Sequence, residues 1–357
     1  MDFELSDEQQ ALQEAARDLL DGYSAPAHVR AHLASGLSHD QKLWTAMLEQ
    51  GWMGITTELG FGWVEASVLL EEVGRHTAPA PYLPSLLALS ALGDTPWAVR
   101  LQSGDAIGCA AWGRHIEIGP GPTLSGRPDL VLAADEADVA VVWTPQALFA
   151  VDLTAAASAK PAQPARQPAM DQTRSLAWLE LDATPATEIG GPDAAAALLD
   201  RAAVGFSAEM LGGAARVLEM SADYAKDRVQ FGQPIGSFQA VKHRCADMVV
   251  DVEGMRSTTW YAAWCLDAAN QPDQPGPPDE VAIAASSAKA WCADAAKRVM
   301  ASGLQVHGGI GFTWEHDLHL FLKRSQLDQV SFGDAAYHRD RLAALLRSRV
   351  QAGQSVI

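Results

Sequence analysis

The sequence predicts a mainly α-helical protein with a β-domain in its centre, and two observations lead to this fold class. Apolar residues recur at helical spacing in long segments towards both ends of the chain. Between these segments, short apolar runs alternate with Gly, Pro and Asp. We therefore expect an amino-terminal helical domain over residues 1–105, a small antiparallel β-barrel or sandwich over 106–190, and a carboxy-terminal four-helix bundle over 191–357.

The amino-terminal domain begins with a helix-capping motif. Ser6 is followed three residues later by Gln9, with two acidic residues between them, and this pattern favours the start of a helix. Prolines at positions 79, 81 and 84 interrupt the chain further on, before a last short helix. The apolar spacing predicts helices over residues 6–20, 43–48, 64–73 and 86–92.

The central domain is predicted from short apolar runs that turn-forming residues separate. Such a dense series of runs favours a small antiparallel barrel or sandwich. The segment over residues 155–168 is rich in Ala, Pro and Gln, which predicts a solvent-exposed loop. Strands are expected over residues 107–112, 130–133, 139–143, 148–153 and 176–181.

The carboxy-terminal domain is organised around a connector between two long predicted helices. Gly and Pro residues between positions 232 and 236 do not fit inside a helix, so the chain must turn there and leaves Arg228 near a helix end. On spacing alone, the simplest interpretation is a helical hairpin in which Arg228 pairs with a surface carboxylate. Prolines over residues 272–278 interrupt the helical pattern once more. Helices are predicted over residues 198–224, 239–269, 280–303, 318–322 and 339–350.

Composition and charge restrict the class of function. The chain has 357 residues, 48% apolar and 20% charged, as in a soluble globular protein with a large core. Its net charge of −18 argues against nucleic acid or an anionic membrane as a partner. The cysteines are scattered and His316-x-x-His319 alone is no zinc site, so we expect neither a disulfide framework nor a metal centre. The first residues lack a secretory signal pattern and no apolar run is long enough to span a bilayer, which predicts a cytoplasmic protein.

Two separated motifs occur in the carboxy-terminal part of the chain. The first is Arg228-x-x-Phe-Gly-x-x-Ile-x-x-Phe-Gln239 between two long helices, and the second runs from Gln305 to Thr313 with the sequence Gln-Val-His-Gly-Gly-Ile-Gly-Phe-Thr. In order and spacing, the two motifs resemble the cofactor-binding segments of the acyl-CoA dehydrogenase family.

This resemblance implies an FAD-dependent α,β-desaturation of an acyl-CoA thioester. Arg228 would neutralise the pyrophosphate of FAD through charge-assisted hydrogen bonds, and the paired glycines would let the backbone approach the dinucleotide closely. The resemblance implies FAD contacts by Arg228, Gln230, Phe231, Gln239, Gln305, Gly308 and Gly309.

The central domain departs from the family's pattern. Flavin-binding relatives have a Thr-Glu-Pro and Gly-Ser-Asp loop and a Trp-Ile-Ser/Thr-Asn strand that hold the isoalloxazine ring. Residues 111–115 and 130–133 stand near these positions here, and neither segment offers the expected hydroxyls. The resemblance therefore implies that this chain lacks part of the ring-binding site.

The position of the family's catalytic base departs as well. The base is usually the glutamate of a Tyr-Glu-Gly-Thr segment, and Phe332 stands at that position here. Some relatives carry the base on the helix before the arginine motif, and the carboxylates nearest to the corresponding position, Ala202, are Asp200 and Glu209. Asp200 would need a shift of the helix register, whereas Glu209 lies two turns further along the same face. Asp334 is a further candidate. Because Phe332 stands at the family's usual base position, no carboxylate occupies that place.

The two departures lead to a hypothesis of divided labour. The chain resembles the smaller subunit of the α2β2 acyl-CoA dehydrogenases of actinobacterial steroid side-chain breakdown, in which a larger subunit would supply the base and the ring pocket. This chain would then complete the partner's FAD site. Two alternatives stay open: a self-sufficient homotetramer with Glu209 or Asp334 as a relocated base, and a flavin-free scaffold that only pairs with another acyl-CoA dehydrogenase.

Overall fold

The computed structural model describes residues 4–57, 60–154, 164–269 and 279–354. These residues form two compact units, each assembled from separate stretches of the chain. The helical unit contains Met1–Pro26, Phe61–Ala78 and Ala203–Ile357, and the mixed unit contains Ala27–Gly60 and Pro79–Ala202. The division into three consecutive domains at residues 105 and 190 stays a prediction.

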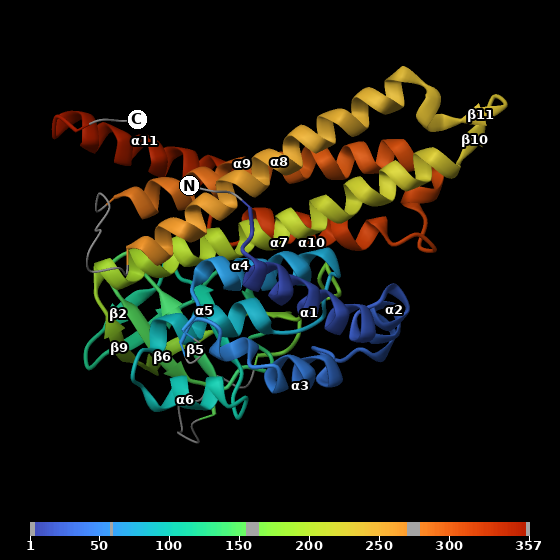
Figure 1. The fold of residues 1–357 in the computed structure, drawn as a ribbon. Coiled ribbons are helices and arrows are strands. Elements are labelled where there is room, and N and C mark those ends of the chain that lie inside the picture. The colour runs from blue at the N-terminus through green and yellow to red at the C-terminus, as the bar shows by residue number, and fades with distance from the viewer. Residues whose placement is uncertain (1–3, 58–59, 155–163, 270–278, 355–357) are drawn as a thin grey trace. The chain divides into compact units, whose positions relative to one another are not determined.

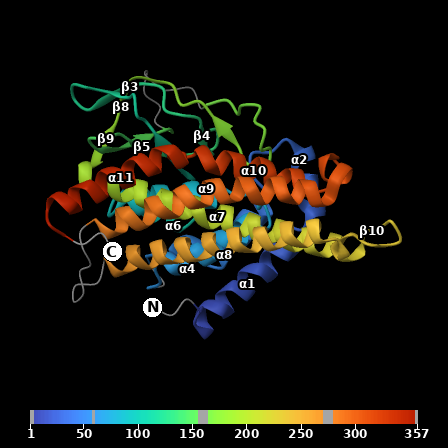
Figure 2. The ribbon, with the colours of Figure 1, turned by 90° about the horizontal axis from the view of Figure 1, so that it is seen from above.

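Long helices dominate the helical unit. Helix α9 packs against α8, α10 and α11, and the views in Figure 1 and Figure 2 show these helices side by side. Within the described ranges, every helix is too short or too polar to cross a lipid bilayer. The helices are α1 (Asp7–Tyr23), α4 (Trp63–Arg75), α7 (Pro192–Asp227), α8 (Gln239–Ala268), α9 (Glu280–His307), α10 (Leu318–Val330) and α11 (Ala335–Gln351).

The capping motif at the start of α1 is confirmed. The backbone amide of Gln9 donates to Ser6 Oγ over 3.2 Å, and the amide of Ser6 donates to Gln9 Oε1 over 3.0 Å. Each of the two interactions satisfies an amide that the first turn of a helix leaves without an intrahelical partner. The sequence pattern therefore locates the start of α1.

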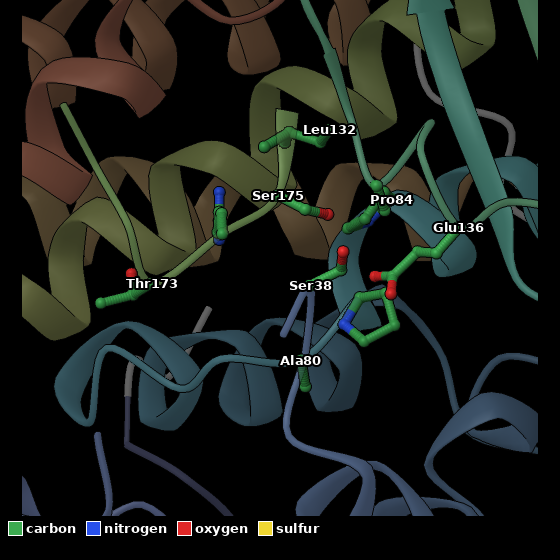
Figure 3. A pocket seen from close by; sticks show the side chains of 10 residues that line it. Ser38, Ala80, Pro84, Leu132, Glu136, Thr173 and Ser175 are labelled. Carbon is green, nitrogen blue, oxygen red and sulfur yellow. The ribbon is translucent and has the colours of Figure 1, made fainter. Parts of the chain in front are cut away.

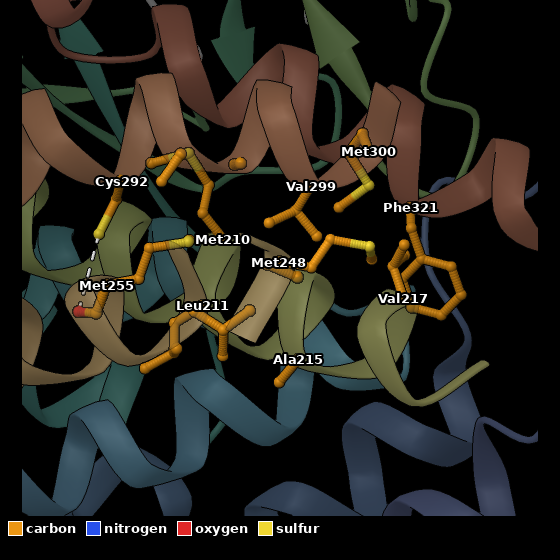
Figure 4. Packing of buried hydrophobic residues seen from close by; sticks show 14 of the residues in the cluster. Met210, Leu211, Ala215, Val217, Met248, Met255, Cys292, Val299, Met300 and Phe321 are labelled. Atoms are coloured by element: carbon orange, nitrogen blue, oxygen red, sulfur yellow. Dashed lines mark hydrogen bonds between the residues drawn. The ribbon is translucent and has the colours of Figure 1, made fainter. Parts of the chain in front are cut away.

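The core of the helical unit is rich in sulfur and small side chains. Methionines from α7, α8 and α9 interlock with Val217, Val299 and Phe321 (Figure 4). Flexible methionine side chains fill irregular spaces between helices that cross at different angles. Helices α4 and α7 approach so closely that a Cβ atom at Gly212 would overlap the Glu71 carbonyl. A glycine weakens a helix interior, so this close crossing is the physical reason for its presence.

The mixed unit places short helices beside three small sheets of the described residues, and a fourth, two-stranded sheet belongs to the helical unit. Its helices are α2 (Pro26–Ser35), α3 (Gln41–Glu49), α5 (Tyr82–Leu92) and α6 (Pro96–Gln102). The largest sheet has the order β1-β5-β6-β9, a second has the order β2-β3-β8, and β4 pairs with β7 and β10 with β11, the last pair in the helical unit. The strands are β1 (Gly108–Trp112), β2 (Glu117–Gly119), β3 (Thr123–Gly126), β4 (Val131–Leu132), β5 (Val139–Trp143), β6 (Leu148–Asp152), β7 (Leu176–Ala177), β8 (Leu181–Pro185), β9 (Thr187–Gly190), β10 (Val229–Gln230) and β11 (Gln233–Pro234).

The predicted fold class, mainly α with a central β region, is confirmed. Two details of the β-domain are wrong. Strands β1 and β5 pair in parallel, with Gly108 opposite Val139, because a long excursion rather than a hairpin connects them. The described strands also form separate sheets with free edges, so they do not close into a barrel.

The strand boundaries show which apolar runs in the sequence predicted strands correctly. The run over residues 139–143 matches β5, whereas the run over 176–181 divides into β7 and the start of β8. Strands β2 and β9 were not predicted, because most of their side chains are exposed or half-buried and carry no apolar pattern. Most of the predicted loop over 155–168 and the predicted break over 272–278 lie outside the described residues.

Candidate functional site

The predicted connector forms a small hairpin at the end of α7. Strands β10 and β11 pair antiparallel, and a 3-10 turn over Ile235–Ser237 leads into α8. Phe231 and Gly232 occupy the turn with φ of +51° and +80°, the backbone that a two-residue hairpin requires. The hairpin projects beyond the ends of α7 and α8 (Figure 1, Figure 2).

Arg228 stands at the base of this hairpin with an exposed side chain. Its backbone is fixed, since its amide donates to the Tyr224 carbonyl over 2.9 Å and its carbonyl accepts from the Ile235 amide over 2.8 Å. Within the described part of the chain, no carboxylate pairs with the guanidinium. By contrast, Arg75 binds Glu219 through both terminal nitrogens, over 2.5 and 2.7 Å. Arg228 therefore does not form the surface ion pair expected from spacing alone with any carboxylate of residues 4–57, 60–154, 164–269 and 279–354.

The second motif lies where α9 ends. Gln305 and Gly309 are exposed, and Gly308 has a φ of +63° that favours glycine. A Cβ atom built at Gly308 or Gly309 would meet no atom within 4 Å. The glycines thus leave open space beside the backbone, into which a group from outside the chain can come.

Aromatic contacts bring the two motifs to the same end of the helical unit. The ring of Tyr224, one turn before Arg228, stacks on the ring of His307 with 4.7 Å between centroids. His307 Nδ1 donates to the Gly303 carbonyl over 2.8 Å, and burial lowers the pKa of this imidazole, so it is neutral and structural. We call the Arg228–Gln239 connector together with Gln305–Gly309 the open end.

The remaining predicted FAD contacts also lie on the surface of the open end. Gln230 and Gln239 are exposed, and the side chain of Phe231 keeps 92% of its surface accessible. Among the residues that the structure describes, Gln230 Nε2 donates only to the neighbouring Val229 carbonyl, over 2.8 Å. These side chains are therefore available to a group that this chain does not itself provide.

The candidate bases lie elsewhere and differ in their surroundings. Asp334 is exposed and caps α11, because its Oδ1 accepts from the Tyr337 amide over 2.9 Å. This hydrogen bond holds the pKa of Asp334 below its ordinary value, whereas abstraction of a weakly acidic proton needs a raised pKa. Asp200 and Glu209 are buried on α7, at 5% and 1% exposure.

Phe332 lies in a tight turn between α10 and α11. It has a φ of +52°, unusual for a bulky residue, and its ring stacks on Phe206 of α7 with 6.0 Å between centroids. Both rings are buried. An aromatic pair therefore fills the space around the position where the family resemblance expects an acid.

A small polar pocket in the mixed unit adjoins the strand that stands at the ring-binding position. Leu132 and Ala133 line it, and hydroxyls of Ser38, Thr173 and Ser175 reach it from two other loops (Figure 3). Sequence reasoning missed these hydroxyls, because they come from separate loops that carry no motif. The cavity measures about 10 Å³, which is enough for one water.

The residues present fit one part of FAD better than the other. At the open end, the unpaired guanidinium of Arg228 and the free space at Gly308 and Gly309 suit a dianionic pyrophosphate. The pocket beside Leu132 is far below the size of a chamber for a flavin ring. The fit is therefore good for the phosphate end, whereas the pocket beside Leu132 does not fit the ring.

Comparisons with known proteins agree with the motifs. Family models match residues 6–93 (acyl-CoA dehydrogenase, N-terminal domain) and 190–346 (acyl-CoA dehydrogenase, C-terminal domain). The acyl-CoA dehydrogenase IpdE2 of Mycobacterium tuberculosis is 36% identical over 330 residues, which cover 89% of this chain and 91% of the relative.

Solved structures show a similar fold. The ChsE4–ChsE5 complex from Mycobacterium tuberculosis matches with a TM-score of 0.86 and 28% identity, covering 97% of this chain and 99% of that chain. A variant of the Tcur3481–Tcur3483 steroid ACAD matches with a TM-score of 0.85 and 29% identity, over 97% and 99% of the two chains. The chain therefore belongs to the acyl-CoA dehydrogenase family.

Proposed function

We propose that this chain is a subunit of a heteromeric, FAD-dependent acyl-CoA dehydrogenase and that it completes the FAD site of a larger partner subunit, which supplies the catalytic base. The carrying observation is the open end, where the Tyr224–His307 stack brings two features to the same end of the helical unit. These are Arg228, which has no carboxylate partner among the described residues, and a turn with free space around its glycines. A buried phenylalanine at the usual base position supports the second half of the proposal.

The similar proteins favour this reading over a homomeric enzyme. Both solved structures described above carry two-chain names, and one of them is described as a steroid enzyme. We infer a two-chain assembly and a bulky, apolar acyl-CoA such as a steroid side-chain thioester as substrate. FAD, when bound, would accept the β-hydride of the acyl group.

This chain's own residues would bind and orient the cofactor of the partner. The Arg228 guanidinium would neutralise charge on the pyrophosphate and donate two parallel hydrogen bonds to its oxygens. The point charge of a lysine would provide this geometry less well. The exposed backbone at Gly308 and Gly309 would allow contact without a side chain in between. Gln230, Gln239 and Gln305 would donate and accept hydrogen bonds at the dinucleotide edge.

Exposed aromatic side chains near the open end also support assembly. Phe231, Phe312 and Trp314 are 92%, 74% and 67% exposed. Burial of one such ring on a partner would contribute roughly 2 kcal/mol. A monomer in solution would leave this apolar surface in water, so a stable partner surface is the simpler arrangement.

The alternatives have less support. A homotetramer with Asp334 as base would need a raised pKa, and the Tyr337 amide acts in the opposite direction. A flavin-free scaffold would not require an arginine without a carboxylate partner at the open end. Purification of the chain alone tests the first alternative, because a yellow and active homotetramer would contradict the division of labour.

The experiment that tests the proposal measures flavin in a co-expressed complex. Arg228→Ala removes the proposed pyrophosphate contact, and it should reduce FAD retention about tenfold or more, since charge-assisted hydrogen bonds contribute roughly 1.5–3 kcal/mol. Arg347→Ala, an exposed arginine on α11, is the matched control and should leave flavin absorbance unchanged. Equal flavin content in both variants would favour the scaffold.

A further inference from the structure

Lys289 is a fully buried lysine in the core of the helical unit, with 0% of its surface exposed. Its Nζ donates to the Gln329 carbonyl over 3.0 Å and to the Gly333 carbonyl over 2.7 Å. Gln329 lies in the last turn of α10, where carbonyls lack helical partners and the helix dipole is negative. The buried amino group therefore donates hydrogen bonds both to the end of α10 and to the turn that follows it.

His338 holds the same turn from its other side. It is 0% exposed, and its Nε2 lies 3.0 Å from the Phe332 carbonyl. Because a carbonyl only accepts, the proton of the neutral ring is on Nε2. Burial lowers the pKa of His338 to about 3, with the charge of Lys289 as a further cause, so the ring stays neutral at ordinary pH.

Together the two side chains bind the carbonyls of residues 329, 332 and 333. We call residues 329–334 the 332 turn. Phe332 and Gly333 both have a positive φ, of +52° and +98°, in this turn. The left-handed backbone is unfavourable for phenylalanine, so the surrounding contacts must stabilise it. Its direction brings the 332 side chain onto Phe206, whose ring centroid lies 5.9 Å from Lys289 Nζ.

We propose that Lys289 and His338 are positioning residues for side chain 332. By binding the turn's carbonyls, they fix the direction of that side chain independently of what the side chain is. We call the 332 turn with these two residues the platform. Because its geometry does not depend on the residue at position 332, phenylalanine can stand there in place of an acid without changing the turn. The inference rests on the proposed function only in identifying position 332 with the family's base position.

The opposing explanation is that the Phe332–Phe206 stack itself holds the turn. The two explanations differ in which substitution opens it. The backbone amide of Ser331 donates to the Leu327 carbonyl over 3.2 Å, and the amide of Tyr337 donates to Asp334. Hydrogen exchange of these two amides therefore reports opening of the turn from both sides.

The first experiment compares Lys289→Met, Phe332→Ala and Cys292→Ala by amide hydrogen exchange. Methionine retains most of the lysine volume but loses the donors, so exchange at Ser331 and Tyr337 should become about tenfold faster or more. Phe332→Ala should change it much less. Cys292 lies one turn along α9 and is equally buried, so it controls for general core damage. Faster exchange in Phe332→Ala than in Lys289→Met would overturn the proposal.

His338 provides a second pair of variants in case Lys289→Met does not fold. His338→Ala removes the donor to the Phe332 carbonyl and should open the turn. His338→Gln places an amide nitrogen near the position of Nε2 and should restore protection. Identical exchange in the two variants would show that the hydrogen bond does not hold the turn.

The second experiment titrates an acid placed on the platform. In Phe332→Glu, a carboxyl that keeps the direction of the Phe332 ring would lie beside Phe206, whose ring centroid is 5.9 Å from Lys289 Nζ. The other titratable groups that act on Lys289 or on this turn are His338, Asp328 and Asp334. Removal of the nearest cation in Phe332→Glu/Lys289→Met should raise the pKa of that carboxyl by about one unit or more. A carbon-13 NMR titration measures the shift, and the same pKa in both variants would contradict a fixed side-chain direction.

These measurements are made on the isolated chain and need no flavin. Failure of the Arg228 experiment would remove the proposed cofactor duty but leave the exchange results intact. Conversely, an unchanged 332 turn in Lys289→Met would reject the platform and leave the FAD proposal in place. The two proposals therefore fail separately.

Discussion

The open end and the 332 turn, both in the helical unit, differ in the exposure and the hydrogen-bond partners of their charged side chains. At the open end, the guanidinium of Arg228 is exposed and has no carboxylate partner among the described residues. In the 332 turn, the ammonium of Lys289 is buried and binds two carbonyls of the chain itself. The charged group of the first region is left open to solvent, whereas that of the second region is bound by the chain's own carbonyls.

This difference teaches how to separate functional charges from structural ones. Burying an ion is costly unless hydrogen bonds compensate it, so a buried lysine with two acceptors is explained by its own fold. Leaving an exposed arginine unpaired carries no burial penalty. The hydrogen-bonded backbone of Arg228 and the open glycines at the same end of the unit need another explanation. The lack of a carboxylate partner among the described residues, rather than burial, distinguishes Arg228 as the cofactor candidate.

The largest expected effect tests how tightly the helices of this unit cross. Gly212→Ala would force a Cβ atom into the Glu71 carbonyl on α4, a backbone atom that cannot move aside easily. We expect the melting temperature to fall by roughly 1–5 °C, since overpacking costs about 1–3 kcal/mol. Gly213→Ala is the matched control, because the nearest atom to its Cβ would be 3.6 Å away. Equal shifts in the two variants would contradict the close crossing.

The next effect concerns the pH dependence of stability at the 332 turn. Burial lowers the pKa of Lys289 to about 7, against the opposing charge of buried Asp328. Between about pH 7 and the ordinary lysine pKa, the unfolded chain binds more protons than the folded one, so stability rises with pH in this window. The rise is at most about 1.4 kcal/mol per pH unit for one group.

Denaturant unfolding at pH 7 and pH 9 measures this contribution. In Lys289→Met the increase between the two pH values should be smaller than in the parent chain. Lys226→Met, at an exposed position on α7, is the matched control and should retain the parent's increase. A parent chain that loses stability over this range, with Lys289→Met unchanged, would show that Lys289 is not held in this way.

Much of the fold could be predicted from local signals. Helix α8 was predicted to within one residue, because Gln239 follows the Gly and Pro of the connector and the apolar spacing is regular. The parallel pairing of β1 with β5 could not be predicted, since period-2 patterns do not report the direction of a neighbouring strand. Exposed strands such as β2 were not predicted, because they contain no apolar run.

The candidate site was predictable only where it depends on a linear motif. Arg228 and Gly308 were found because their spacing resembles that of a family. The Tyr224–His307 stack shows that the fold brings their two motifs to the same end of the helical unit. Lys289 gave no signal, since one lysine within an alanine-rich helix is an ordinary surface pattern. Its role depends on the Gln329 and Gly333 carbonyls, which no sequence pattern places beside it.

A smaller effect separates capping from catalysis at Asp334. Asp334→Ala should lower the free energy of unfolding by about 1 kcal/mol, because the cap of α11 is lost. Asp334→Asn keeps a good capping residue, so its stability should stay near that of the parent. In a co-expressed complex, the turnover of Asp334→Asn should equal that of the parent. A complete loss of turnover in this variant would support the alternative in which Asp334 is the catalytic base.

The smallest effect on the isolated chain is expected at the open end. Gly309→Ala adds a Cβ atom that would meet nothing within 4 Å, and its φ is not in the left-handed region. Its free energy of unfolding should therefore stay within about 0.5 kcal/mol of the parent. Gly308→Ala, at a φ of +63°, is the contrasting variant and should cost about 1 kcal/mol.

The same two variants then reveal what uses the free space at the open end. If a cofactor lies against this backbone in the assembled enzyme, Gly309→Ala should release flavin from the co-expressed complex even though the isolated chain is as stable as the parent. Flavin absorbance of the purified complex measures this loss. Full flavin retention in Gly309→Ala would mean that no ligand uses the space at the open end. The difference between the open end and the 332 turn would then have no bearing on function.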